Sequence, residues 1–154
     1  MDKEIIVEVA DSPQSMEAIF GVRREVFVIE QQVSEEEEYD EFETSSTHLV
    51  ASCENRVVGT CRYRNTSDGI KMERFAVLKE FRIRSVGASL LSAALAAVDQ
   101  NKFIYLHAQV QVVGFYKKFG FIKVGERFEE AGIQHYKMVY SPQDSKINKL
   151  IHRH

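Results

Sequence analysis

The stretch Lys71–Gln100 constrains the fold of this chain most, because a strand, a charged loop and a helix follow one another there without interruption. Lys71–Leu78 reads as a strand, and Ser85–Gln100 reads as a long helix rich in Ala and Leu. A helix start presents unpaired backbone N–H groups and the positive end of the helix dipole to the preceding loop. Both favour a bound anion such as a diphosphate.

The residues of this loop fit an anion site but do not prove one. Arg82 and Arg84 add positive charge, Gly87 and Ala88 leave the first turn without bulk, and the Ser85 hydroxyl can cap the helix. A capped core helix with two exposed arginines explains the same stretch equally well. The patterns GxGxxG and GxxxxGK[ST] are both absent, which argues against a Rossmann dinucleotide site and a P-loop.

The other elements alternate in type along the chain, and tight turns join several of them. Asp11 or Ser12 is expected to cap the first helix, with Pro13 at its first position. Gly120 is expected to end the last helix. The expected strands are Ile5–Val9, His48–Cys53, Arg56–Arg64, Lys71–Leu78, Phe103–Ala108, Ile122–Phe128 and Gln134–Tyr140; the expected helices are Pro13–Ile29, Ser85–Gln100 and Val112–Phe119; the expected turns are Glu54-Asn55, Asn65–Gly69 and Ala131-Gly132. This order predicts an α+β sheet with helices on both faces.

Length and charge narrow the class of protein. The chain has 154 residues, which fits one domain over residues 1–141 and a polar C-terminal tail over 142–154. A net charge of −3 gives no basic field for nucleic acid. No run of ~18 apolar residues predicts a membrane span, and the N-terminus does not resemble a signal peptide, so we expect a cytoplasmic protein. Cys53 and Cys61 lack zinc-ligand spacing and are expected to be reduced thiols.

Two segments carry a family resemblance. "ERFAVLKEFRIRSVGASLL" places Arg82–Gly87 on the pattern [QR]-x-x-G-x-[GA], and "AQVQVVGFYKKFGFIKVGE" contains FYxxxGF at Phe115–Phe121. In this order they resemble the GNAT superfamily of N-acyltransferases. "VFVIEQ", "YDEF" and "GIQH" are similar to its ElaA/YjcF-like group. The resemblance implies an α/β/α sandwich with a mixed central sheet of about six or seven strands.

The resemblance also implies an activity and a co-substrate. It predicts an N-acetyltransferase that uses acetyl-CoA and no metal, acts on a small-molecule or peptidyl amine, and is compatible with a homodimer. A non-catalytic acyl-CoA-binding domain on the same scaffold is the alternative. Ile83 and Ser85 stand where relatives commonly have glycine. The residues implied in CoA binding are Phe75, Ala76, Val77, Arg82, Ile83, Arg84, Ser85, Val86, Gly87, Ala88, Gln109 and Phe115.

The catalytic groups are less defined by the sequence. By resemblance Tyr116 lies near the sulfur and protonates the leaving thiolate, although an amphipathic core tyrosine is the other interpretation. The candidates for a base are Glu73, Glu30, Asp40, His107 and His135, and a water relay needs none of them. Glu73 is expected to share a strand face with Phe75 and Val77, and an ion pair with an arginine is the competing role for it.

The acceptor site is expected near the acidic run Glu35–Glu43. In the resembling family this region flanks the entrance for the amine, with Glu30, Asp40 and His135 as expected contacts. A cationic amine would be attracted to such a run. A solvated acidic loop is the alternative interpretation, and the sequence alone favours it.

Overall fold

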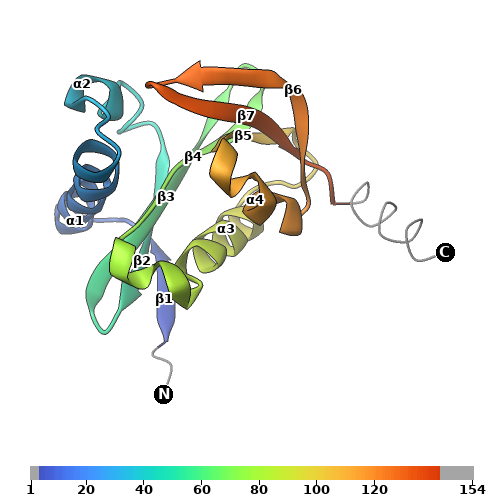
Figure 1. Ribbon diagram of the computed structural model, residues 1–154. Coiled ribbons are helices and arrows are strands. Elements are labelled where there is room, and N and C mark those ends of the chain that lie inside the picture. The colour runs from blue at the N-terminus through green and yellow to red at the C-terminus, as the bar shows by residue number, and fades with distance from the viewer. Residues whose placement is uncertain (1–3, 143–154) are drawn as a thin grey trace. The chain divides into compact units, whose positions relative to one another are not determined.

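The computed structural model describes residues 4–142, in which seven strands form one mixed sheet with the order β1-β2-β3-β4-β5-β7-β6 (Figure 1). The strands are β1 Ile5–Val9, β2 Thr47–Cys53, β3 Arg56–Thr66, β4 Gly69–Val77, β5 Ile104–Gln109, β6 Phe121–Glu130 and β7 Ile133–Tyr140. The helices are α1 Pro13–Arg23, η1 Arg24–Glu30, α2 Glu35–Glu38, η2 Lys79–Arg84, α3 Val86–Ala97, η3 Val110–Val112 and α4 Val113–Lys118. The expected sheet with about six or seven strands is confirmed.

The chain divides into two compact units. Unit 1 holds residues 4–65 and 72–100, and unit 2 holds residues 66–71 and 101–142. That residues 1–141 form one domain stays a prediction. The expected C-terminal tail, from residue 143 onward, lies outside the described residues. In the described part of the chain, no helix is both long and apolar enough to cross a membrane.

Local sequence signals set the start of unit 1. The Ser12 hydroxyl accepts a hydrogen bond from Ser15 N at 3.1 Å, and Pro13 stands at the first turn of α1, as expected. Strands β1, β2 and β3 are antiparallel neighbours. Glu54 and Asn55 join β2 to β3 with φ of 51° and 65°, which is the conformation of a two-residue type I′ hairpin. The expected tight turn is therefore confirmed.

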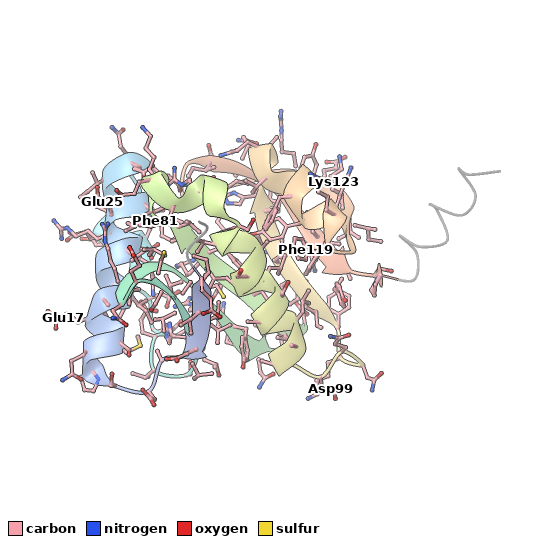
Figure 2. The ribbon with its side chains drawn as sticks, turned by 90° about the horizontal axis from the view of Figure 1, so that it is seen from below. Glu17, Glu25, Phe81, Asp99, Phe119 and Lys123 are labelled. Carbon is pink, nitrogen blue, oxygen red and sulfur yellow. The ribbon has the colours of Figure 1, made fainter. Side chains whose placement is uncertain are left out.

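The first helix changes its geometry halfway along. A single helix over Pro13–Ile29 is expected, but from Arg24 to Glu30 the chain is a π-helix, in which Gln31 N donates to Val26 O at 3.1 Å. A π-turn closes after five residues instead of four, so the buried face moves on to Phe27. Ile29, expected on the apolar stripe, is 55% exposed. Exposed Glu17 and Glu25 mark the outer side of this helical segment (Figure 2).

Helices cover both faces of the strands in unit 1. A Cβ added to Gly59 would lie 2.8 Å from Val86 Cγ1 and 3.2 Å from Leu90 Cδ1, so α3 packs closely on that face of β3. Figure 2 shows α3 running from near Phe81 to near Asp99. Arg62, three residues after Gly59, points to the opposite face, where it meets residues that follow α1. The side-chain alternation of β3 thus separates an apolar face from a charged one.

Unit 2 is built around the antiparallel strands β5, β7 and β6. Ala131 and Gly132 have φ of 52° and 76° and form the expected turn between β6 and β7. Gly120 has φ of 97° and donates to Lys117 O at 3.1 Å, which ends α4 as expected. In β4, the first residues also belong to this unit, and Ile70 N donates to Phe103 O at 2.8 Å.

Candidate functional site

The predicted phosphate loop runs directly into the start of helix α3. The η2 turn, Lys79–Arg84, leads to Ser85 with φ of 62° and ψ of 22°, and α3 begins at Val86. The N–H groups of the first turn of α3 have no acceptor inside the helix. The expected cap by the Ser85 hydroxyl is wrong, because this left-handed residue makes no side-chain cap bond; instead its carbonyl accepts from Ser89 N at 3.0 Å. The side chains of Ile83 and Arg84 lie outside the described part of the structure.

Arg82 holds the loop to two neighbouring segments of unit 1. Its Nε donates to Val77 O at 3.0 Å, and its second guanidinium nitrogen, Nη2, lies 2.9 Å from Glu30 Oε1. Glu30, expected to contact the acceptor, is therefore engaged with an expected CoA-binding residue. Because the Arg82 side chain is still 42% exposed, its charge remains available to an anion at the helix start.

The backbone of strand β4 is irregular immediately before the expected pantetheine-binding residues. Arg74 has φ of 57°, a conformation that costs energy for a residue with a Cβ. Glu73 and Arg74 are consecutive, yet both side chains reach the same group of charges, since Glu73 bonds Arg62 and Arg74 bonds Asp40. The expected regular alternation along β4 is therefore wrong at Arg74. Ala76 is buried, and its neighbours on either side are half-buried.

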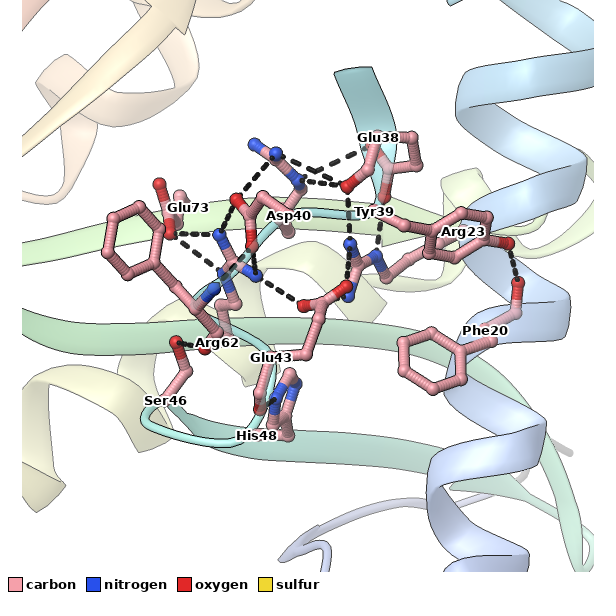
Figure 3. Close-up of polar contacts among 12 residues, drawn as sticks. Phe20, Arg23, Glu38, Tyr39, Asp40, Glu43, Ser46, His48, Arg62 and Glu73 are labelled. Carbon is pink, nitrogen blue, oxygen red and sulfur yellow. Dashed lines mark hydrogen bonds and ion pairs between the residues drawn. The ribbon is translucent and has the colours of Figure 1, made fainter. Parts of the chain in front are cut away.

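Eight charged side chains of unit 1 form what we call the buried ion-pair network (Figure 3). Its members come from α1, from the acidic run and from strands β3 and β4. They are Arg23, Arg62, Arg64, Arg74, Glu38, Asp40, Glu43 and Glu73. Four cations thus face four carboxylates, which balances the charge of the network.

Arg62 is the centre of this network. Its side chain has no exposed surface and contacts three carboxylates: Asp40 at 2.6 Å, Glu73 at 2.5 Å, and Glu43. Arg23 joins the same network from α1, with its Nε 2.5 Å from Glu38 and Nη2 2.9 Å from Glu43. A buried charge of this kind needs several partners, because removal from water is costly.

The ionisation of the network follows from burial and from its arginines. Burial acts to raise the pKa of Asp40, but the hydrogen bond and the charge of Arg62 outweigh it and lower that pKa to about 2. Burial raises the pKa of Glu38 in spite of Arg23 and Arg74. Burial also lowers the pKa of His48, whose Nε2–H donates to Glu43 O at 2.7 Å. His48 therefore lies beside the network as a neutral hydrogen-bond donor to the backbone of Glu43.

The network changes two expectations about the site. Glu73, a candidate base, is buried and shared between Arg62 and Arg64, so a proton acceptor role would require it to leave two guanidinium groups. The acidic run is neither a uniform solvated surface nor a uniform attracting patch. Glu35, Glu36, Glu37 and Glu41 are exposed, whereas Glu38, Asp40 and Glu43 belong to the network.

In unit 2, the expected Tyr116 is largely buried on α4. Its ring lies 5.2 Å from the ring of Phe115 and 5.9 Å from that of Phe121. Gln109 ends β5 and pairs with His135 of β7, a buried residue whose Nδ1 lies 2.7 Å from Ile133 O. This unit therefore brings two of the expected residues together, Gln109 and His135.

Sequence reasoning missed one polar contact in unit 2. His107 Nδ1 lies 3.0 Å from Glu130 Oε2. The two residues are 23 positions apart, so only the pairing of β5 with β7 and of β7 with β6 brings them together. A signal was present, since the predicted turn at Ala131-Gly132 fixes the register in which Glu130 lies beside Ile133.

The comparisons with known proteins agree on one family. Residues 10–142 match the model of the acetyltransferase (GNAT) domain. The uncharacterized N-acetyltransferase YjcF of Bacillus subtilis is 41% identical over 135 residues, which cover 85% of this chain and 96% of YjcF. The protein ElaA of Escherichia coli is 30% identical over 134 residues, which cover 82% of this chain and 88% of ElaA.

Solved structures share the fold. The crystal structure of Escherichia coli ElaA aligns with a TM-score of 0.78 at 26% identity, over 88% of this chain and 99% of that one. An aminoglycoside 6′-N-acetyltransferase complexed with coenzyme A aligns with a TM-score of 0.70 at 14% identity, over 87% of this chain and 95% of that one. At that identity the second comparison supports the fold alone.

Proposed function

This chain belongs to the GNAT family of acyl-CoA N-acyltransferases, and from that premise we propose that it transfers the acetyl group of acetyl-CoA to an amine. One observation carries the proposal for the co-substrate: the left-handed Ser85 directs the chain from the η2 turn straight into the first turn of α3. The diphosphate of CoA would accept hydrogen bonds from the N–H groups of Val86, Gly87 and Ala88.

The packing of α3 supports this placement of the diphosphate. Gly59 leaves little room for a side chain between β3 and the first turns of α3, so the start of the helix packs directly against the strand. Ser85 tolerates the left-handed conformation without glycine, at a cost of about 1–2 kcal/mol. The substitution of Ser for the usual glycine is therefore compatible with a working loop.

The pantetheine arm is proposed to lie along the second half of β4. The positive φ of Arg74 turns the backbone immediately before Phe75, Ala76 and Val77, and a backbone irregularity of this kind is typical of sites that bind a ligand by main-chain groups. Tyr116 is proposed as the acid that protonates the leaving thiolate, because a phenol can donate a proton to a thiolate.

The test of the co-substrate is a thermal-shift titration with acetyl-CoA, CoA and ATP. A ligand that binds only the folded state raises the midpoint, and the rise grows with the logarithm of its concentration relative to its Kd, so we expect a rise with the two CoA compounds and none with ATP. Gly87→Glu should abolish that rise by bulk and like charge. Gly21→Glu is the matched control, since an added Cβ at Gly21 meets nothing within 4 Å.

Transfer is tested separately from binding. Release of the CoA thiol in the presence of a panel of amines measures it, and we expect a rate that depends on the amine. Equal responses to CoA and ATP, or an unchanged response in Gly87→Glu, would contradict the proposed diphosphate site. Binding of acetyl-CoA without transfer to any amine would instead favour the acyl-CoA-binding domain.

A further inference from the structure

The face of unit 2 that carries His107 is not the face covered by α4. Tyr116 of α4 packs on Phe121 of β6, and the register places Phe121 beside Tyr140 of β7. His135 is an odd number of residues from Tyr140, so its side chain points to the other face of the sheet. The pairs between strands put His107 and Phe128 on this second face with His135.

Glu130 fixes the tautomer of His107. An ionised carboxylate only accepts hydrogen bonds, and the hydrogen bond from His107 lowers the pKa of Glu130 to about 2. The Nδ1 atom of His107, 3.0 Å from Glu130 Oε2, therefore carries the proton of the contact. In the neutral ring Nε2 then holds the free lone pair, which is the arrangement of a base oriented by a carboxylate.

Aromatic neighbours hold the ring in this orientation. The ring of Phe128 meets that of His107 edge to face at 4.9 Å and stacks on the ring of His135 at 5.8 Å. Tyr105 lies on the same strand at 6.1 Å between ring centroids. The His107 side chain nevertheless keeps 26% of its surface exposed, so a small molecule can reach it.

Other carboxylates and imidazoles of the described chain are engaged differently. Of the candidate bases, Glu30 pairs with Arg82 at 2.9 Å and Asp40 with Arg62 at 2.6 Å. The Glu73 carboxylate is buried between two arginines. His48 is buried and donates its Nε2–H to a backbone carbonyl, so that nitrogen offers no lone pair in that tautomer. His135 is 8% exposed. The imidazole of His107 combines a carboxylate on Nδ1 with access from solvent.

We propose that His107 is the general base that deprotonates the amine acceptor, and that Glu130 is a positioning residue that orients the imidazole and stabilises its charged form. This inference rests on the proposed acetyl transfer. In the step, Nε2 takes one proton from the ammonium group, and the freed nitrogen lone pair forms the N–C bond at the thioester carbonyl. The C–S bond then breaks, the thiolate takes a proton, and the amide nitrogen loses its second proton, so one proton is released per acetyl group.

The charged and titratable groups around His107 fit this role. Glu130 contributes a negative charge from β6, and Lys137 lies beside His107 in the register of β7. The Lys137 ammonium is placed 5.0 Å from the ring centre of Tyr105. His135 on β7 and Lys71 at the start of β4 act on Glu130 through their charge. Of these groups, Glu130 is the one in hydrogen-bond contact with the His107 ring, at 3.0 Å from Nδ1.

The experiment follows kcat/KM for the amine against pH in the wild type and in His107→Gln. We expect a loss of about 10²-fold or more in His107→Gln, the scale of general base catalysis, with KM for acetyl-CoA unchanged. The acid limb of the wild-type profile should disappear in this variant. Added imidazole should restore part of the activity of His107→Ala, which a purely structural role would not predict.

The variant Glu130→Gln tests whether Glu130 positions His107 without itself contacting the amine. It should lower kcat/KM about tenfold, because the imidazole loses the carboxylate that accepts its Nδ1–H and orients the ring. Glu129→Gln is the matched control: it removes the adjacent carboxylate of β6, whose side chain alternates to the other face, and should leave the profile unchanged.

The outcomes distinguish this inference from the proposed function. If the wild type acetylates amines and His107→Gln does so at an equal rate with an equal pH profile, His107 is not the general base, but the proposed acetyl transfer is unaffected. Equal behaviour of Glu129→Gln and Glu130→Gln likewise overturns the pair of His107 and Glu130 without touching acetyl transfer. A wild type that is stabilised by CoA but acetylates none of the amines overturns both.

Discussion

Replacement of Arg62 by Met should cost this protein much of its stability. Arg62→Met keeps an unbranched side chain of similar length but leaves Asp40, Glu43 and Glu73 without their shared cation. The loss of one partner from a buried ion pair costs about 3–5 kcal/mol, because the remaining charge stays away from water. For a domain of this size each kcal/mol lowers the melting temperature by about 2–4 °C, so the fall should be roughly 6–20 °C.

The loss of stability in Arg62→Met should be smaller at low pH than at neutral pH. The pKa of Asp40 is 3.8 in an ordinary environment and about 2 here. A lowered pKa stabilises the folded state above pH 3.8, and this contribution disappears as the pH falls through about 2. It amounts to about 2 kcal/mol, since one pKa unit corresponds to about 1.4 kcal/mol. In Arg62→Met this contribution is absent, so the two proteins should differ less at pH 3 than at pH 7.

Urea unfolding at pH 7, 5, 4 and 3 measures both effects through the free energy of unfolding. Arg24→Met is the matched control, because Arg24 pairs with Glu35 at 2.6 Å but both side chains are more than half exposed. An exposed pair contributes about 0–1 kcal/mol. The double variant Arg62→Met with Asp40→Asn should recover part of the loss at pH 7. If Arg62→Met costs no more than Arg24→Met, the idea of a stabilising network is refuted.

Three further predictions concern the co-substrate loop, the acid and the acceptor entrance. Ser85→Gly should raise the free energy of unfolding by about 1 kcal/mol, because glycine adopts φ of 62° without strain; a loss of stability in urea unfolding would contradict this interpretation of the loop. Tyr116→Phe should lower kcat by about 10²-fold while the thermal shift with acetyl-CoA is kept, and a wild-type rate would exclude Tyr116 as the acid. Replacement of the exposed Glu35, Glu36 and Glu37 by Gln should raise KM for a cationic amine at low salt only, and an equal salt response in both proteins would show that these charges do not steer the acceptor.

Short-range signals in the sequence predicted most of the secondary structure. The cap at Ser12 with Pro13, and the turns at Glu54-Asn55 and Ala131-Gly132, depend on neighbouring residues alone. The π-helix escaped prediction because the apolar spacing up to Val26 fits an ordinary helix. The change becomes visible only where Phe27 is buried and Ile29 is 55% exposed.

The candidate site was less predictable, because its contacts join residues far apart in the chain. The 36 positions between Glu38 and Arg74 are bridged by the packing of α2 near β4, and the 23 between His107 and Glu130 by the pairing of strands. A run of acidic residues read alone also gives no sign of which carboxylates are buried. Glu37 is exposed and Glu38 is buried, although the sequence around them is EEEE.

The buried ion-pair network also restricts how this protein can change over evolutionary time. A mutation that removes one of its eight charges leaves an opposite charge uncompensated inside the fold, whereas a coordinated change of two partners restores neutrality. A lineage that lost Arg62 before any of its three carboxylates would pass through a protein with little remaining stability. Relatives should therefore keep Arg62, Asp40 and Glu73 together or replace them together, and drift should concentrate at exposed pairs such as Arg24 and Glu35.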